Sequence, residues 1–231
     1  MHEWPTTVEE ARQIQQQLRS AVIIQDQLGN VTRIAGVDAG FTDDQAHAAI
    51  VVLDYPSLQP LDYAEAYRSL TFPYVPGFLS FREAPVILDA LEKLQIQPDL
   101  IICDGQGLAH PCRFGIACHI GVLTDIPAIG CAKSRLVGKH DPLPEERGAY
   151  VSLSDDGEEI GVVLRSRAGV KPLYISAGHR ISLPTAIQYI MGCVTKYRLP
   201  APIRAAHDLA SNNRVPQLAI RPEQRSLFAD E

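Results

Sequence analysis

Hydrophobic and polar positions along the chain first follow a pattern typical of strands. Short apolar runs bounded by turn-forming residues predict strands at residues 34–38, 48–53 and 61–71. The gaps between these runs are too short to hold a helix, so we expect three consecutive strands that form a meander. Before them, residues 7–24 have helical character, with apolar positions separated by Glu and Gln.

Beyond a proline-containing loop at residues 73–78, the pattern changes to alternating helices and strands. Apolar residues first recur at three- and four-residue spacing, and later runs are continuous, as in strands covered on both faces of a sheet. The predicted elements are a helix over 86–94, a strand over 99–104, a helix over 115–123, a strand over 127–132 and a helix capped by Ser182. Strands that flank a helix should be parallel, which predicts an α/β fold.

Length and composition favour one globular domain. The chain has 231 residues, of which 46% are hydrophobic, enough for a sizeable core. We expect a single domain over residues 1–231, with a polar tail that frays from about residue 213. No apolar run approaches the roughly 18 residues that a membrane helix needs. The N-terminus also lacks the pattern of a secretion signal, so a cytoplasmic protein is expected.

The five cysteines form no close pair of the C-x-x-C kind, which favours reduced thiols. Structural zinc requires clustered Cys and His at short spacing and is therefore disfavoured. A weak zinc alternative remains, because Cys112 and Cys118 lie six residues apart near His110 and His119.

The net charge of −6 argues at first against a nucleic-acid partner, but the charge is unevenly distributed. Residues 160–204 contain seven basic residues and no acidic one, which leaves 14 basic and 27 acidic residues elsewhere. Such a stretch could form one positive face that binds phosphates, since binding depends on the local field. It could equally be a chance run of solvated side chains, and the sequence leaves both interpretations open.

Two predicted strands end in an aspartate that a glycine soon follows, at Asp38 and Asp104. In α/β sheets, ligands bind beyond the carboxyl ends of the strands. Two close carboxylates repel unless a cation neutralises them, and Mg²⁺ prefers such hard oxygen ligands. A metal placed there can activate water for phosphodiester hydrolysis. The alternative is that each aspartate only caps a turn or a helix.

Glu83 is a third candidate carboxylate. Ser80 to Glu83 has the S-x-x-E form of a capping box. With Ser80 as the cap, however, Pro85 would lie at the fifth helical position, where it cannot donate to the carbonyl of Phe81. We therefore favour a helix that starts nearer Pro85, which leaves Glu83 just outside it and free for chemistry.

Taken together, the motifs resemble the endonuclease V family, the deoxyinosine 3′ endonucleases, over roughly residues 7–210. The segment PYVPGFLSFRE at residues 73–83 is long and unusual, so it carries most of the match. The other matching stretches are IAGVDAG (34–40), PDLIICDGQG (98–107), HPCRFGIA (110–117), PAIGCAKS (127–134) and SAGHRIS (176–182). The resemblance implies an RNase H-like fold, a mixed β-sheet flanked by helices.

The resemblance also implies a set of catalytic residues. Asp38 and Asp104 would hold Mg²⁺, for which Mn²⁺ can substitute, and Glu83 would act beside them through the metal or a water. Lys133 would face the phosphate. His207 would belong to the same site, although it lies where the motif is loosest.

Substrate recognition is implied for a second set of residues. Tyr74, in a loop with Pro76 and Gly77, resembles the family's wedge residue, which is inserted at the lesion so that the base leaves the stack. Gly105 would line the pocket for the flipped hypoxanthine, and His110 would contact the scissile region. The alternative for Tyr74 is an aromatic that packs on its own prolines.

The chain departs from the family pattern at two positions. Gln106 stands where histidine is more frequent, and Cys112 stands where an arginine is common. The implied partner is DNA that contains deoxyinosine or another deaminated base, bound by a monomer. Rival interpretations are an inosine-specific endoribonuclease, a catalytically silent RNase H-like binding module and a metal-dependent phosphatase.

Overall fold

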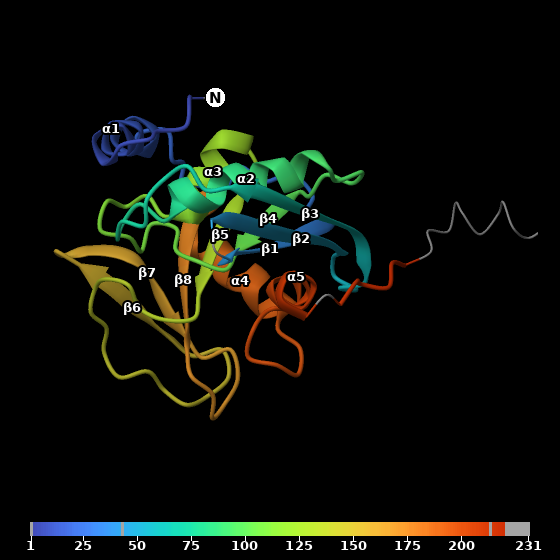
Figure 1. Cartoon of the computed structure of the whole chain (residues 1–231). Helices are drawn as coiled ribbons and strands as arrows, with labels where there is room; N and C mark the ends of the chain where they lie inside the picture. The colour runs from blue at the N-terminus through green and yellow to red at the C-terminus, as the bar shows by residue number, and fades with distance from the viewer. Residues whose placement is uncertain (1, 43, 213, 220–231) are drawn as a thin grey trace, which may run out of the picture.

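The computed structural model describes residues 2–42, 44–212 and 214–219. Within these residues, eight strands form one mixed sheet in the order β3-β2-β1-β4-β5-β8-β7-β6, and five helices accompany it (Figure 1). The strands are β1 Arg33–Thr42, β2 Gln45–Asp54, β3 Pro60–Ser69, β4 Leu100–Cys103, β5 Ala128–Ala132, β6 Tyr150–Asp155, β7 Glu158–Leu164 and β8 Leu173–His179. The helices are α1 Val8–Arg19, α2 Ser80–Glu92, α3 Ile116–Thr124, α4 Leu183–Cys193 and α5 Ala201–Asn212.

The predicted meander is confirmed, because β1, β2 and β3 pair antiparallel in sequence order. β4 then lies parallel to β1 and to β5, with α3 as the crossover between β4 and β5. The last three strands pair antiparallel with their neighbours. The α/β prediction of a mixed sheet flanked by helices is therefore confirmed.

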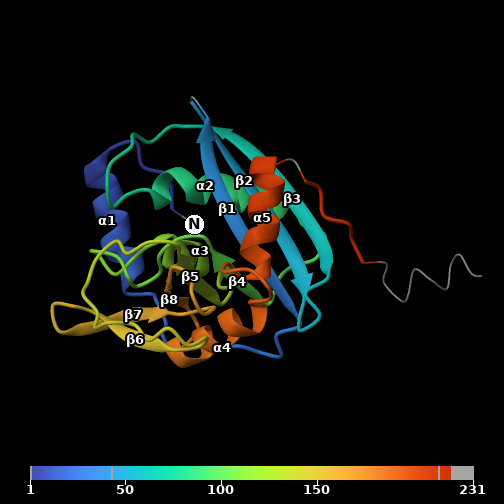
Figure 2. The ribbon, with the colours of Figure 1, turned by 90° about the horizontal axis from the view of Figure 1, so that it is seen from below.

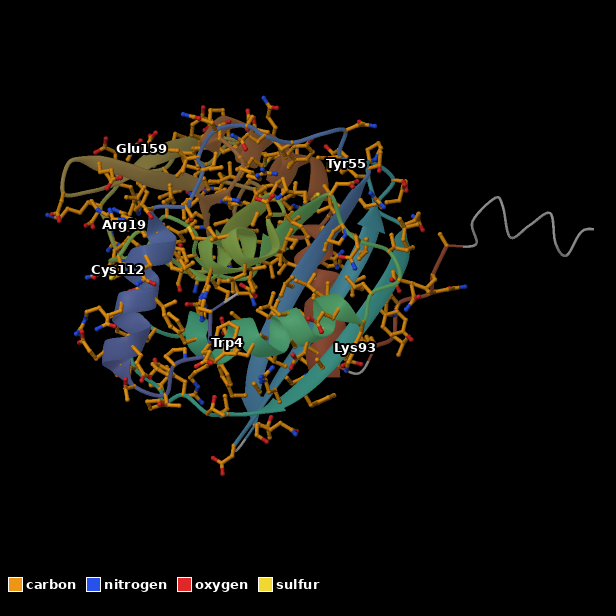
Figure 3. All side chains as sticks on the ribbon, turned by 90° about the horizontal axis from the view of Figure 1, so that it is seen from above. Trp4, Arg19, Tyr55, Lys93, Cys112 and Glu159 are labelled. Atoms are coloured by element: carbon orange, nitrogen blue, oxygen red, sulfur yellow. The ribbon has the colours of Figure 1, made fainter. Side chains whose placement is uncertain are left out.

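Helices cover both faces of the sheet. α2 and α3 pack on one face through an apolar cluster that includes Val37, Ile87 and Ile120. α4 and α5 lie on the other face, as Figures 1 and 2 show, and bury residues such as Ile102 and Ile190. The N-terminal segment crosses the helices of the first face, where Trp4 packs against its core (Figure 3).

Several predicted boundaries were wrong. The first helix ends at Arg19, well before residue 24. β1 continues to Thr42, so Asp38 lies inside the strand and not at its end. The backbone of residues 39–42 continues to pair with β2 although the side chains become exposed, and exposed positions give no apolar signal.

The start of α2 also differs from the prediction. The helix begins at Ser80 after Leu79, which makes no side-chain cap, so Ser80 does not form a capping box. Glu83 lies in the first turn of the helix and Pro85 lies inside it, which contradicts our placement of Glu83 outside. The proline removes one backbone hydrogen bond. Burial of Phe81, Ala84 and their apolar neighbours keeps the segment helical despite that loss.

Three further features bear on the sequence predictions. All five cysteines are free thiols, of which Cys112 is exposed and the other four are buried. No helix among the described residues is long and apolar enough to cross a membrane. The predicted frayed tail from residue 213 falls largely on positions outside the described residues. Within residues 214–219, the amide of Ala219 donates a hydrogen bond to the carbonyl of Pro60 at 2.7 Å.

Candidate active site

Asp38 lies in β1 and Asp104 directly follows β4, and these two strands are parallel neighbours in the sheet. Val37 lies opposite Cys103 in the β1–β4 register, and the Asp104 amide donates to the Val37 carbonyl at 3.1 Å. The two aspartates each come directly after one member of this pair, so they lie side by side on strands that are about 4.8 Å apart. Sheet hydrogen bonds fix this juxtaposition.

Glu83 reaches the same site from the first turn of α2. Burial, together with the negative charges of Asp38 and Asp104, raises the pKa of Glu83 to about 8. This coupling shows that the three carboxylates share one electrostatic environment, in which a full set of negative charges is unfavourable.

Two basic side chains contact the aspartates. The ammonium group of Lys133, just after β5, forms an ion pair with Asp104. His207 of α5 donates from Nδ1 to Asp38 Oδ2 at 2.9 Å. Burial raises the pKa of Asp104, and the Lys133 pair opposes that rise. The structure thus brings His207 into the site, although its motif was the weakest in the sequence.

A glycine explains how α5 comes close enough for His207 to reach Asp38. A Cβ atom on Gly36 would lie 2.0 Å from the carbonyl oxygen of Pro202, at the start of α5. The helix therefore rests directly on the backbone of β1, and Figure 2 shows it lying over the part of the sheet formed by β1 and β2. Only glycine permits such a close backbone approach.

The donor set fits a divalent cation by its chemistry. Asp38, Asp104 and Glu83 offer carboxylate oxygens, the hard ligands that Mg²⁺ takes. The raised pKa of Glu83 marks an excess of negative charge that a cation would relieve. In the part of the chain that the structure describes, no group of three His, Cys, Asp or Glu side chains is already arranged as a metal cage. Lys133 and His207 instead contact the two aspartates.

A cavity of about 420 Å³ adjoins the carboxylates. All five residues predicted to bind substrate line it: Tyr74, Pro76, Gly77, Gly105 and His110. Glu83, Asp104 and Lys133 line it as well, whereas Asp38 and His207 lie outside its lining. Three of the five predicted catalytic residues therefore share one cavity with the predicted recognition residues.

Residues 73–78, here called the wedge loop, form one wall of this cavity. Tyr74 in this loop is 68% exposed, so most of its ring faces solvent. The guanidinium carbon of Arg82 lies 5.8 Å from the centre of the Tyr74 ring and 4.5 Å from that of Phe41. An exposed aromatic beside a cation suits contact with nucleic-acid bases.

His110 forms part of the opposite wall. Its Nδ1 accepts a hydrogen bond from the Cys112 amide at 3.2 Å, which leaves the ring proton on Nε2. Burial, with the nearby charge of Arg113, lowers the pKa of His110 to about 4, although a hydrogen bond with the Gly77 backbone counteracts this. The imidazole is therefore neutral near pH 7.

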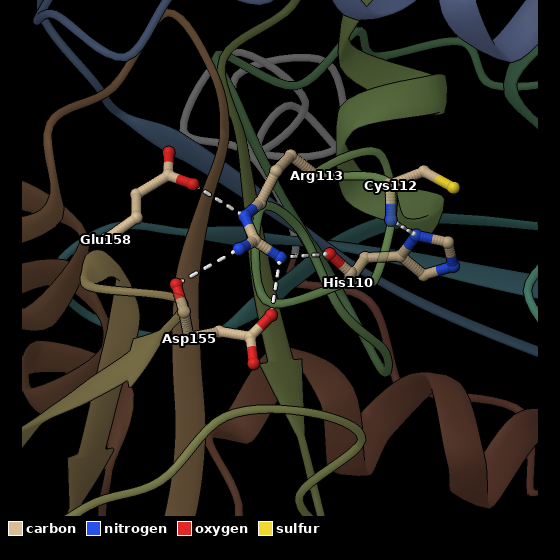
Figure 4. A network of polar contacts seen from close by, with 5 residues as sticks. All are labelled: His110, Cys112, Arg113, Asp155 and Glu158. Carbon is tan, nitrogen blue, oxygen red and sulfur yellow. Dashed lines mark hydrogen bonds and ion pairs between the residues drawn. The ribbon is translucent and has the colours of Figure 1, made fainter.

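Arg113 supports this wall and was not foreseen from the sequence. Its guanidinium contacts Asp155 at 3.0 Å, Glu158 at 2.7 Å and the carbonyl of His110 at 3.0 Å (Figure 4). Asp155 and Glu158 lie on the β6–β7 hairpin, so one arginine ties that hairpin to the His110 turn. The only sequence signal was its place next to Cys112 in the HPCR motif.

The two departures from the family pattern lie at different places. Gln106 lines the cavity, and its side-chain amide donates to the carbonyl of Ser134 at 3.0 Å. Cys112 is exposed and outside the cavity lining. The departure at Gln106 therefore adjoins the cavity directly.

Several basic residues of the stretch 160–204 are engaged in contacts within the protein. Arg165 pairs with Glu145 at 2.9 Å, Arg180 pairs with Asp125 at 3.1 Å, and Arg198 donates to the Lys133 carbonyl at 2.8 Å. These three arginines hold loops together, and two of them, Arg165 and Arg180, have an acidic partner.

Comparison with known proteins identifies the family. A sequence model of endonuclease V matches residues 16–208. Endonuclease V of Roseiflexus castenholzii is 61% identical over 216 residues, which cover 94% of this chain and 97% of the relative. Endonuclease V of Nostoc punctiforme is 59% identical, with 91% of this chain and 96% of the relative covered.

Solved structures give the same result. The crystal structure of endonuclease V from Streptomyces avermitilis superposes with a TM-score of 0.87 at 42% identity, covering 91% of this chain and 94% of that one. Endonuclease V from Ciona intestinalis, in complex with a 24mer DNA containing an inosine followed by a ribo-adenosine, gives a TM-score of 0.77 at 28% identity. That match covers 89% of this chain and 97% of the other. The chain therefore belongs to the endonuclease V family of nucleases, which hydrolyse phosphodiester bonds.

Proposed function

We propose that the protein is a DNA repair endonuclease that acts on deoxyinosine. It hydrolyses the second phosphodiester linkage 3′ to the lesion and leaves 3′-hydroxyl and 5′-phosphate ends. The observation that carries this proposal is the juxtaposition of three coupled carboxylates with a cavity of about 420 Å³ and an exposed tyrosine. The relative from Ciona intestinalis, bound to DNA that contains an inosine, supports the choice of substrate.

The family is metal-dependent, and we propose Mg²⁺ as the ion, with Mn²⁺ as a substitute. Asp38 and Asp104 would hold it, and Glu83 would act directly or through a water. When bound, the ion supplies an activated water and stabilises the leaving oxygen. Glu83 positions the attacking water and takes part in its deprotonation, which requires the ionised carboxylate that a bound cation favours.

Lys133 and His207 act on the same carboxylates in different ways. In the proposed mechanism, the Lys133 ammonium leaves Asp104 and turns to the scissile phosphate, where it stabilises the developing negative charge. His207 keeps its hydrogen bond to Asp38 and so holds that carboxylate in one orientation. Lys133 therefore exchanges one anion for another, whereas His207 is a positioning residue.

Recognition is assigned to the walls of the cavity. Tyr74 would enter the duplex where the base leaves the stack, because a rigid aromatic can fill the gap. The extruded base would lie against Gly105 and the backbone of Gly77, with the neutral His110 nearby. Pro76 limits the conformations of the loop that carries the tyrosine.

A nicking assay tests the proposed function. The substrate is a duplex oligonucleotide with one deoxyinosine, incubated with and without Mg²⁺, and the enzymes are wild type and Asp38→Ala. Wild type should nick the lesion strand only when Mg²⁺ is present, and Asp38→Ala should not nick it. Nicking that survives the substitution would contradict the mechanism.

A second candidate activity is cleavage of RNA at inosine. The Ciona intestinalis relative was bound to DNA with a ribo-adenosine directly after the inosine, which favours testing a ribose at the scissile position. Matched DNA and RNA oligonucleotides, together with DNA carrying other deaminated bases, decide between the substrates. Strong preference for RNA would overturn the DNA assignment.

We further propose that residues 1–231 act as one domain, as a monomer and in the cytoplasm. Three carboxylates and the whole cavity lining come from this one chain. Light scattering during size-exclusion chromatography tests the monomer, for which a mass near 25.3 kDa is expected.

A further inference from the structure

Helix α1 carries a polar side chain on its buried face. Gln15 follows Ala11 by about one helical turn, and these two residues are the buried positions of α1. Gln15 is only 2% exposed. A buried amide costs free energy unless it is hydrogen-bonded, so such a position calls for partners.

The partners of Gln15 are two carbonyl oxygens from separate walls of the cavity. Nε2 lies 3.2 Å from the oxygen of Gly77 and 3.4 Å from the oxygen of Phe114. An amide NH₂ group has two hydrogens, so it can make both bonds at once. Phe114 precedes Gly115, the N-cap of α3, and both Gly77 and Gly115 line the cavity. Gln15 therefore joins two walls of the cavity from behind.

The surroundings of Gln15 hold the wedge loop on α1. Gly77 has φ +85°, a conformation that favours glycine. The loop buries Phe78 in a cluster that contains Ala11, with Ile14 packed against it. Gly77 is thus held on α1 by the hydrogen bond from Gln15 and by the packing of the adjacent Phe78.

We propose that Gln15 is a positioning residue that couples the wedge loop to the base pocket. This coupling fixes the position of Tyr74 relative to the base pocket, so that the tyrosine enters the duplex at the place that the extruded base leaves. This inference rests on the proposed function and extends it to a residue just before the stretch that the family model matches. Hydrolysis itself does not involve Gln15, so the residue should matter most when a base must leave a duplex.

The test compares two substrates of one sequence. One is a duplex in which deoxyinosine is paired with dC, and the other is the deoxyinosine strand alone. Gln15→Met keeps a long unbranched side chain but removes both donated hydrogen bonds. We expect the ratio of the duplex to the single-strand nicking rate, both under single-turnover conditions, to fall about fivefold to tenfold, as for the loss of one or two neutral hydrogen bonds.

The ratio separates positioning from a general loss of stability. A lower folded fraction reduces both rates alike and leaves their ratio unchanged. Gln16→Met is the matched control, because Gln16 is exposed on the same helix, and its ratio should equal that of wild type. Gln15→Asn keeps the amide but shortens its reach, so it should lower the ratio too, and it provides the measurement if Gln15→Met does not fold.

The outcomes distinguish this inference from the proposed function. An unchanged ratio in Gln15→Met and Gln15→Asn, or equal losses on both substrates, would overturn the positioning role. Wild-type protein that nicks neither substrate in Mg²⁺ would contradict the proposed function instead.

Discussion

At the scale of single residues, the site balances its own negative charge with basic side chains. Lys133 pairs with Asp104, and His207 donates to Asp38. Glu83 feels burial and both aspartates at once, which raises its pKa to about 8. A phosphate or a cation that enters the site must therefore compete with contacts already present.

Lys133→Met tests this competition. The substitution removes the cation proposed to stabilise the phosphate, so we expect the single-turnover nicking rate to fall about a hundredfold. The Mg²⁺ concentration for half-maximal rate should not rise, because Asp104 loses a competing partner. Lys139→Met, which removes an exposed lysine at a neighbouring strand bridge, is the control and should keep the wild-type rate. A Lys133→Met rate equal to wild type would rule out the proposed role.

At the scale of elements, one buried arginine connects the cavity wall to a distant hairpin. Arg113→Met should lower the free energy of unfolding by about 1–2 kcal/mol, because the His110 carbonyl loses a charged donor while Asp155 and Glu158 remain partly solvated. Urea denaturation measures this change. Arg147→Met, at an exposed arginine, should leave the midpoint unchanged. A similar loss in both variants would show that Arg113 has no special anchoring role.

The elements also show which parts of the fold the sequence could predict. The central strands were predictable because each buries a continuous apolar run, as at residues 100–103. The end of β1 was not, because residues 39–42 pair through their backbone while their side chains turn to solvent. The start of α2 was misplaced because tertiary burial of Phe81 outweighs the local effect of Pro85.

The candidate site divides in the same way. Asp38 and Asp104 could be recognised as candidates from the sequence, because both follow clear apolar runs. They lie side by side because β1 and β4 are parallel neighbours in the sheet. His207 could be placed only by the family motif, since its contact depends on how α5 lies on β1. Gln15 gave no signal and Arg113 only its place in the HPCR motif, because a buried polar residue shows its partners only in three dimensions.

At the scale of the whole molecule, the acidic site should couple stability to pH. The folded-state pKa of Glu83, about 8, lies above its ordinary value of 4.5, so the folded protein binds the proton more tightly than the unfolded chain. This stabilisation is complete below pH 4.5 and is lost as the pH rises through 8. In EDTA, the contribution of Glu83 to the free energy of unfolding should therefore fall over this range.

Two comparisons test whether Glu83 causes this pH dependence of the free energy of unfolding. Glu83→Gln should flatten it, because the titrating group is gone, and saturating Mg²⁺ should reduce it in wild type, because a bound cation favours the ionised carboxylates. Urea titrations at a series of pH values provide the measurement. An identical slope in Glu83→Gln would show that another group is responsible.

The distribution of thiols gives a second whole-molecule prediction. Cys103, Cys118, Cys131 and Cys193 are buried, and burial raises the pKa of each thiol, whereas Cys112 is exposed. Iodoacetamide should therefore label the native protein once and the denatured protein five times. Mass spectrometry of the intact protein and its peptides counts and locates the labels. Modification of a buried thiol before Cys112 would contradict the packing.

The glycine beneath α5 has a consequence for engineering this enzyme. Even a methyl group at position 36 would collide with the Pro202 carbonyl, so every substitution must push the helix outward. A saturation library at this codon should therefore return glycine alone among active clones, although Gly36 does not line the cavity. Positions that tolerate no substitution are thus of two kinds: residues that take part in the reaction, and residues such as Gly36 that allow a catalytic helix to pack closely on the sheet.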